Sequence, residues 1–423
     1  MRVLVVLPLY GGSLPVGRYC AGALRELGHQ VEVFEAPDFY DSYRALKSLK
    51  VTSDRLQYLE NSYLQVVGQA ILAKVETFEP DLVLAMAQAP LSIQALKRLK
   101  RDGVPTAMWF VEDYRLFTYW QAYAQHYDFF AVIQKDEFLA QLQQLGVEKS
   151  LYLPLAAHPE VHKRLELLSA ERRKFGSDVS FMGAGYPNRR MAFRDLVRFD
   201  FKIWGTDWDG DAILAPYVQM DGARVSSEDC VRIFNATKVN INLHSSIQAR
   251  ELVTGGDFVN PRTFEVAACG AFQLVDRRGL MAELFVTDGP EAELAVFDDM
   301  AELPGRIEHF LAHPEERVAM AKRGQARVLA EHTYAARMRT LLDFIATRKP
   351  GWPKPRVSAA ASQGLPPELA TEIDALLERL GLPADTGFED LVWAVRSQQG
   401  KLGGLDAAVL FLDEWRKLYV RKG

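Results

Sequence analysis

Cysteine is scarce in this sequence: Cys20, Cys230 and Cys269 are the three cysteines among 423 residues. An odd and scattered set lacks the paired spacing of a zinc site and does not make a disulfide framework, so we expect a reducing compartment and no structural metal. A large excess of charge of either sign is also lacking, because the formal net charge is −5 at pH 7. A surface dedicated to nucleic acid or to an anionic membrane is therefore not expected.

Long apolar runs are missing as well. The run at residues 3–7 is followed closely by Pro8 and by the pair Gly11 and Gly12, whereas a membrane-spanning helix needs roughly 20 apolar residues. The run is also too short for the apolar core of a signal peptide and has no small-residue cleavage site. We interpret it as a buried strand and expect a soluble, cytoplasmic protein.

Apolar strands and amphipathic helices alternate through residues 1–156, which predicts a parallel, doubly wound α/β sheet. The expected strands are 3–7, 30–34, 82–86, 106–111, 129–133 and 151–153, and the expected helices are 16–27, 56–77, 91–101 and 135–145.

The alternation restarts after a proline-containing connector, which favours a second domain at residues 157–348 over one large sheet. Its expected strands are 179–182, 201–204, 239–243, 271–275 and 294–297, and its expected helices are 189–198, 227–235, 261–268, 300–312, 314–329 and 334–347. In such sheets ligands bind beyond the carboxyl ends of the strands, so we expect two similar Rossmann-like domains to share one site. We expect the last helix to pack back on the first domain.

The pattern breaks at residues 349–366, where proline, alanine and serine predict a linker. Helical patterns at 367–380, 387–399 and 405–420 then predict a small helical bundle at 367–423. This module could dimerise, dock a partner or simply stabilise the chain.

The segment from Asp257 to Gly270 predicts an anion site. Pro261 suits a first helical position, and the backbone amides of Arg262 and Thr263 lie where a helix dipole favours negative charge. Glu265, one turn deeper, could hold two sugar hydroxyls. A diphosphate and a ribose side by side indicate a nucleotide-sugar pocket.

These residues carry a family resemblance. The run Asn260-Pro-Arg-Thr-Phe-Glu265, with Asn240-Ile-Asn-Leu-His-Ser-Ser246 before it and Ala267-Ala-Cys-Gly270 after it, resembles the spore-maturation (CgeB-type) glycosyltransferase family, which is similar to the GT-B superfamily. The resemblance covers most of residues 150–345. It implies a GT-B architecture of two facing Rossmann-like domains, with the donor on the second domain and the acceptor over the first.

The resemblance also implies roles for two acidic residues separated by seven others. Glu265 would clamp the donor ribose, and Asp257 would touch the donor sugar. The alternatives are that Glu265 only satisfies its helix dipole and that Asp257 is only a turn residue. Because Asp257 stands where many retaining enzymes have a glutamate, the choice between inversion and retention stays open.

Further donor-binding candidates lie at the ends of the second-domain strands. Gly183 follows a strand, and Arg189 in the next helix is the preferred phosphate clamp. His244 could bind phosphate or sugar, or be a satisfied polar residue. Asn260 and Arg262 complete the set, although Arg262 could equally pair with an acid of its own helix.

On the acceptor side, Gly11 and Gly12 close the first strand and form the expected acceptor and phosphate loop. An inverting reaction needs a base for the acceptor hydroxyl, and the candidates are Asp113 first, then His126, with Glu112 also at a strand end. Asp113 could instead cap the following helix.

The sequence therefore predicts a metal-independent glycosyltransferase of hexosyltransferase type, with no cofactor beyond its nucleotide-sugar co-substrate. A UDP-type donor is favoured, and the acceptor is a glycan, a lipid-linked glycan or a protein. Two alternatives stay open: a non-catalytic carbohydrate- or nucleotide-sugar-binding or scaffold protein, and a sugar-nucleotide epimerase on the same fold.

Overall fold

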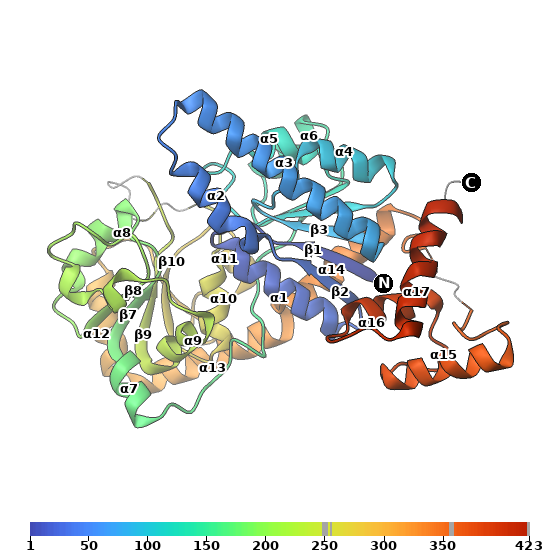
Figure 1. The fold of residues 1–423 in the computed structure, drawn as a ribbon. Coiled ribbons are helices and arrows are strands. Elements are labelled where there is room, and N and C mark those ends of the chain that lie inside the picture. The colour runs from blue at the N-terminus through green and yellow to red at the C-terminus, as the bar shows by residue number, and fades with distance from the viewer. Residues whose placement is uncertain (248–252, 254–255, 355–358, 421–423) are drawn as a thin grey trace. The chain divides into compact units, whose positions relative to one another are not determined.

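The structure is a computed structural model that describes residues 1–247, 253, 256–354 and 359–420. The chain divides into two compact units, Met1–Pro350 and Gly351–Gly423. The first unit contains two parallel sheets with their helices (Figure 1). The two units are described separately below.

The first sheet has six strands in the order β2-β1-β3-β4-β5-β6. Val5 of β1 lies between Val33 of β2 and Leu84 of β3 in parallel register. Both faces of β1 are buried, as expected when helices cover a parallel sheet on both sides. The strands are β1 (Arg2–Val6), β2 (Gln30–Phe34), β3 (Leu82–Met86), β4 (Thr106–Phe110), β5 (Phe129–Val132) and β6 (Ser150–Tyr152).

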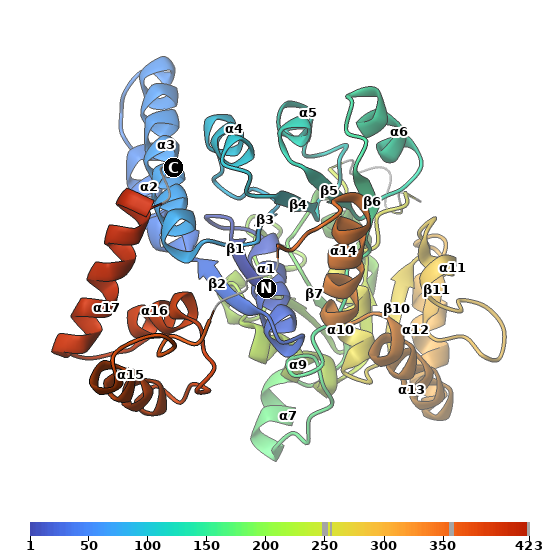
Figure 2. The ribbon, with the colours of Figure 1, turned by 90° about the vertical axis from the view of Figure 1, so that its right-hand side faces the viewer.

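Helices lie on both faces of this sheet, with α3 to α6 along one face and α1 with α14 along the other (Figure 2). The sequence patterns predicted α1, α3, α4 and α6 but not α2 or the one-turn α5, since both are short. The helices that follow the first five strands are α1 (Ser13–Glu26), α2 (Tyr40–Lys47), α3 (Ser53–Phe78), α4 (Ile93–Arg101), α5 (Trp120–Tyr123) and α6 (Glu137–Gln144).

The second sheet has five parallel strands in the order β11-β10-β9-β7-β8. The strands are β7 (Ser177–Met182), β8 (Phe201–Trp204), β9 (Thr237–Asn242), β10 (Gln273–Asp276) and β11 (Ala295–Phe297). All the strands predicted from the sequence are present, with ends within two residues of those expected. The apolar runs were sufficient because most of the strands are buried; β2 and β6, at the two edges of the first sheet, are only partly buried.

The predicted helices of the second sheet are present in order, together with two short helices that were not predicted, at residues 169–175 and 281–284. The helix expected at 189–198 begins earlier, with Pro187 at its first position, and its second half is a 3-10 turn, Phe193–Leu196. The helices are α7 (Ser169–Phe175), α8 (Pro187–Ala192), α9 (Ser227–Ala236), α10 (Pro261–Ala268), α11 (Met281–Leu284), α12 (Leu303–Ala312) and α13 (Pro314–Glu331).

The last helix of this unit, α14 (Tyr334–Arg348), returns to the first sheet and packs against α1. Its Phe344 ring lies 6.2 Å from that of Phe129 in β5. Arg337 donates to the backbone carbonyl of Pro154 at 2.7 Å. The C-terminal segment of the second domain is thereby fixed to the first.

The unit Gly351–Gly423 is built from α15 (Pro367–Arg379), α16 (Phe388–Ser397) and α17 (Gly404–Trp415), and the last helix continues as a π-turn, Arg416–Val420. Its core gathers aliphatic side chains from all three helices, including Ile373, Leu391 and Val409. In the described part of the chain, we find no helix with the length and apolar character that a bilayer crossing requires.

His332 holds the corner between α13 and α14 in the neutral state. Its Nε2 lies 2.8 Å from the carbonyl oxygen of Leu284, which can only accept, so Nε2 carries the proton. Arg337 donates to Nδ1 at 2.7 Å. Burial, together with the charge of Arg337, lowers the pKa of His332 to about 4.

This lowered pKa predicts a pH-dependent contribution to stability. The unfolded chain takes up the His332 proton near its ordinary pKa of about 6.5, so the contribution is complete above that pH and is lost as the pH falls through about 4. The shift corresponds to about 3 kcal/mol. His332→Gln can keep both hydrogen bonds without titrating, so urea unfolding should show a flatter pH dependence than wild type between pH 7 and 4. Parallel curves for the two proteins would contradict this assignment.

Candidate functional site

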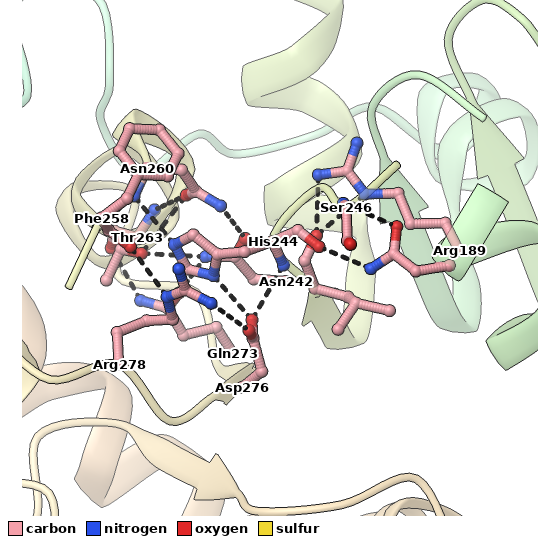
Figure 3. A network of polar contacts seen from close by, with 12 residues as sticks. Arg189, Asn242, His244, Ser246, Phe258, Asn260, Thr263, Gln273, Asp276 and Arg278 are labelled. Carbon is pink, nitrogen blue, oxygen red and sulfur yellow. Dashed lines mark hydrogen bonds and ion pairs between the residues drawn. The ribbon is translucent and has the colours of Figure 1, made fainter. Parts of the chain in front are cut away.

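Residues at the carboxyl ends of the neighbouring strands β9 and β10 lie at the start of α10 (Figure 3). The helix begins there because Asn260 caps it: its Oδ1 accepts from the backbone N–H of Thr263 at 3.2 Å, and Pro261 takes the first helical position. The helix predicted at 261–268 is confirmed, with Pro261 at its first position as expected.

A buried histidine fixes the position of this helix start. Asn260 N–H donates to His244 Nε2 at 2.9 Å, so Nε2 is the unprotonated nitrogen and Nδ1 carries the hydrogen. Nδ1–H donates to Asp276 Oδ1 at 2.6 Å, and the backbone N–H of His244 donates to the same oxygen at 2.9 Å. His244 thus joins the ends of β9 and β10 to the start of α10.

The charges in this network support a neutral imidazole and an ionised carboxylate. Burial lowers the pKa of His244. Burial opposes ionisation of Asp276, but its contacts with His244 and Arg278 hold the pKa of that carboxyl below its ordinary value. The prediction of His244 as a donor contact needs correction: both ring nitrogens are engaged within the protein, so His244 is a positioning residue.

Polar side chains from the neighbouring strands complete the network. Asn242 of β9 donates to Thr263 Oγ1 at 3.0 Å and accepts from Asn260 Nδ2 at 2.8 Å. Gln273 of β10 donates to the carbonyl of Thr263 at 2.7 Å. The predicted donor-binding residues Asn260 and Thr263 therefore have side chains engaged in holding α10.

Arg189 also differs from its prediction as a phosphate clamp. Its Nε and Nη2 donate to the carbonyl of Leu243 at 2.9 and 2.7 Å, and its Nη1 donates to the carbonyl of Ala184 at 3.0 Å. The guanidinium lies 4.9 Å from the Phe181 ring centre, and burial lowers its pKa to about 10. Arg189 fixes the turn after β7 against the end of β9.

Close packing accounts for a glycine in the same turn. A Cβ at Gly185 would lie 2.1 Å from the carbonyl oxygen of Asp207 in the loop after β8. At Gly183 a Cβ would lie 3.0 Å from the Phe181 ring. The sequence predicted Gly183 as a donor contact, and the structure shows that Gly185, two residues later, allows the close approach of the adjacent backbone.

Arg262 and Glu265 form an ion pair within α10, as one of the two interpretations of Arg262 expected. The guanidinium lies over the ring of Phe234, 5.2 Å from its centre, and 27% of the Arg262 side chain is exposed. Glu265 is 8% exposed, and its Oε1 lies 3.8 Å from Nε2 of His162. Burial, followed by the charge of Glu265, raises the pKa of Tyr19 to about 12.

Asp257 connects the second domain to the first. Its Oδ1 accepts from Gln134 Nε2 at 2.8 Å and its Oδ2 accepts from the backbone N–H of Lys135 at 3.0 Å, in the loop between β5 and α6. A further link joins Tyr19 of α1 to Ser227 of α9 at 3.0 Å. The residue predicted to face the donor sugar thus contacts the acceptor-side domain in this structure.

The predicted acceptor loop lies at the carboxyl end of β1. Gly11 has a φ of +107°, a conformation that favours glycine, and its carbonyl accepts from Arg224 of the second domain at 3.1 Å. Gly12 is exposed and precedes the first residue of α1. The loop therefore lies at the carboxyl edge of the first sheet and contacts the second domain.

A second set of polar side chains lies at the same edge, around Glu112, which the sequence predicted only as a secondary candidate for the base. Glu112 follows β4 and accepts hydrogen bonds from Gln88 Nε2 and from the hydroxyl of Tyr119, the latter at 2.8 Å. Gln88 has a φ of +65°, which a residue with a side chain rarely adopts. Burial raises the pKa of Glu112.

The two predicted catalytic residues, Asp113 and His126, lie in positions less suited to a catalytic base than that of Glu112. Asp113 accepts from the backbone N–H of Arg115 at 3.0 Å and so caps the turn that follows β4, as its alternative interpretation expected. His126 precedes β5 and therefore lies at the amino edge of the sheet, opposite the acceptor loop. Burial, with Lys97 and Lys100 nearby, lowers its pKa. We do not retain His126 as a catalytic candidate.

Comparisons with known proteins agree with this architecture. Residues 172–343 match the family described as Glycosyl transferase-like. Spore protein CgeB of Bacillus subtilis (strain 168) is 24% identical over 274 residues, which are 62% of this chain and 82% of that protein.

Similar solved structures show the fold. Sucrose-phosphate synthase from Thermosynechococcus elongatus has a TM-score of 0.55 at 13% identity, covering 82% of this chain and 98% of its own. HepE from Anabaena, in complex with UDP and glucose, has a TM-score of 0.55 at 13% identity, covering 82% of this chain and all of its own. The GT-B fold predicted from the sequence is confirmed.

The buried network predicts that two aspartate substitutions lower the free energy of unfolding by different amounts. Asp276→Ala removes the acceptor of a buried imidazole N–H and a carboxylate 3.5 Å from the buried Arg278, so it should lower the free energy of unfolding by about 3 kcal/mol or more. Asp298→Ala removes an exposed partner of Arg277 and should cost less than about 1 kcal/mol. Urea unfolding of both variants measures the difference, and similar costs would show that the network does not hold α10.

Proposed function

Since this chain has the GT-B fold and resembles the CgeB-type glycosyltransferases, we propose that it transfers a sugar from a nucleotide-sugar donor to an acceptor hydroxyl. We propose a hexosyl donor of UDP type. The structure of HepE contains UDP and glucose, which makes this class the first to test. The proposed acceptor is a glycan, a lipid-linked glycan or a protein.

The observation that carries the proposal is the buried network that fixes the start of α10. The helix dipole gives this end a partial positive charge, and Arg262, which is partly exposed and paired with Glu265, lies in the same turn. A diphosphate bound there would meet positive groups that need not reorganise when the sugar leaves it. This electrostatic support lets us propose that the transfer needs no metal ion.

Glu265 supplies the proposed contact for the ribose. A carboxylate accepts hydrogen bonds from two neighbouring hydroxyl groups, and Glu265 lies one turn beyond the helix start that would hold the diphosphate. Its Oε1 has His162 at 3.8 Å, beyond hydrogen-bond distance, and so keeps lone pairs for a ligand.

On the acceptor side we propose Glu112 as the base. Its raised pKa brings it closer to neutral pH than an ordinary glutamate, which suits proton transfer. In an inverting reaction the acceptor oxygen attacks the anomeric carbon, the bond to the diphosphate breaks, and the hydroxyl proton passes to Glu112. Gln88, held with a positive φ, and Tyr119 orient its carboxylate.

The donor site is tested by thermal stability. At 100 times its dissociation constant, a nucleotide sugar stabilises the fold by about 2.7 kcal/mol. We expect one class in a panel of UDP-, GDP-, TDP- and CMP-sugars to raise the melting temperature of wild type but not that of Glu265→Gln. Glu308→Gln, at an exposed position of α12, is the matched control and should respond like wild type. A shift that persists in Glu265→Gln would remove the ribose role.

Donor turnover separates this proposal from its alternatives. A transferase consumes donor when an acceptor is supplied, an epimerase rearranges the donor without one, and a binding protein leaves it intact. No response to any nucleotide sugar from a folded wild-type protein would favour the scaffold alternative.

The base is tested by paired substitutions in one loop. Glu112→Gln should lower kcat by about a hundredfold or more while donor binding is kept, and Asp113→Asn should stay within a few fold of wild type because that residue caps a turn. Since the base acts in its ionised form, kcat should fall as the pH drops through the raised pKa of Glu112. A large loss in Asp113→Asn with none in Glu112→Gln would reverse the assignment.

A further inference from the structure

Two histidines and a glutamate come together where α12 meets α13. His309 lies in the last turn of α12, His313 lies between the helices, and Glu316 lies in the first turn of α13. One ligand atom of each lies within 4.8 Å of the others. His309 Nε2 is 2.9 Å from Glu316 Oε2, and the two imidazole rings stack with their centres 4.3 Å apart.

We propose that His309, His313 and Glu316 form a binding site for a divalent transition-metal ion, with Zn²⁺ as the best-matched ion. Two imidazoles and one carboxylate are an established ligand set for zinc, and a water molecule would complete a tetrahedron. Mg²⁺ and Ca²⁺ prefer all-oxygen surroundings and fit this set poorly. The site is independent of the proposed transferase function.

The hydrogen bonding of His313 prepares it to bind a metal. Its Nδ1 lies 2.7 Å from the carbonyl oxygen of His309, which only accepts, so Nδ1 carries the hydrogen. Nε2 is then the nitrogen with a lone pair. Metal-binding histidines commonly donate their second ring N–H to such an acceptor, which fixes both tautomer and orientation.

The local charges also favour a cation. The first turn of α13 carries two acidic residues, Glu315 and Glu316. Arg317 is the neighbouring cation, and its Nη1 donates to the carbonyls of Phe310 and Leu311 at the end of α12.

His313 has non-helical backbone angles (φ −118°, ψ 70°) between α12 and α13, so this turn brings His309 of the first helix and Glu316 of the second to the same place. A bound ion would join α12 to α13. It would thereby brace the helix whose Gln325 donates to the carbonyl of Ala268, at the end of α10.

The test is titration calorimetry of tag-free, full-length protein with ZnCl₂, because an affinity tag would supply competing histidines. We expect one ion per chain, and a loss of affinity of more than about tenfold in each of His309→Ala, His313→Ala and Glu316→Gln, since even the supporting partners of metal ligands cost about that much. Glu315→Gln, an exposed neighbour in the same turn, is the matched control and should bind like wild type. MgCl₂ should give no binding.

Two further measurements distinguish this site from a cysteine site and from loss of folding in the variants. The Co²⁺ form should show ligand-field bands without thiolate charge transfer, which separates this site from the half-buried Cys230. Zn²⁺ should raise the melting temperature of wild type and Glu315→Gln but not of the three ligand variants, whose own melting temperatures report whether they fold. Unchanged zinc affinity in both histidine variants, or a thiolate spectrum, would overturn the proposal.

Discussion

The position of α10 depends on the short hydrogen bond between His244 and Asp276. Asp276 fixes the imidazole so that Nε2 faces the backbone N–H of Asn260, and Asn260 in turn caps the helix. Three separate segments of the chain are held by this sequence of contacts. Because the network is buried, each polar atom in it needs a partner, and the loss of one member leaves others without theirs.

The same requirement explains why several expected ligand-binding residues are engaged inside the protein. Arg189 lies in α8 and His244 follows β9, and in both places a polar side chain can serve either a ligand or the backbone. The guanidinium of Arg189 donates hydrogen bonds to the backbone carbonyl oxygens of Leu243 and Ala184, which need donors because they are buried. Local sequence does not reveal such partners, since Leu243 is 54 residues away. These two side chains bind groups of the protein because they are buried beside backbone groups that need hydrogen-bond partners.

The features that were predictable are those encoded over a few residues. Apolar runs predicted the strands, and Pro261 predicted the start of α10. The group of Gln88, Glu112 and Tyr119 was not predictable in this way, because a strained backbone and three segments of the chain create it. The position of His126 was predictable, because it precedes the expected strand at 129–133 and in a parallel sheet this places it at the amino edge, opposite the acceptor loop.

Asp257 lies both at the contact between the two domains and close to the start of α10. Both of its carboxylate oxygens accept hydrogen bonds from the loop after β5 in the first domain, while the chain that carries it leads directly into α10. A donor sugar that reached this carboxylate would have to share or replace the bonds from Gln134 and Lys135. Donor contact at Asp257 and the contact between the domains therefore use the same two oxygens, so the sugar-facing role expected from the sequence is coupled to the position of the loop after β5.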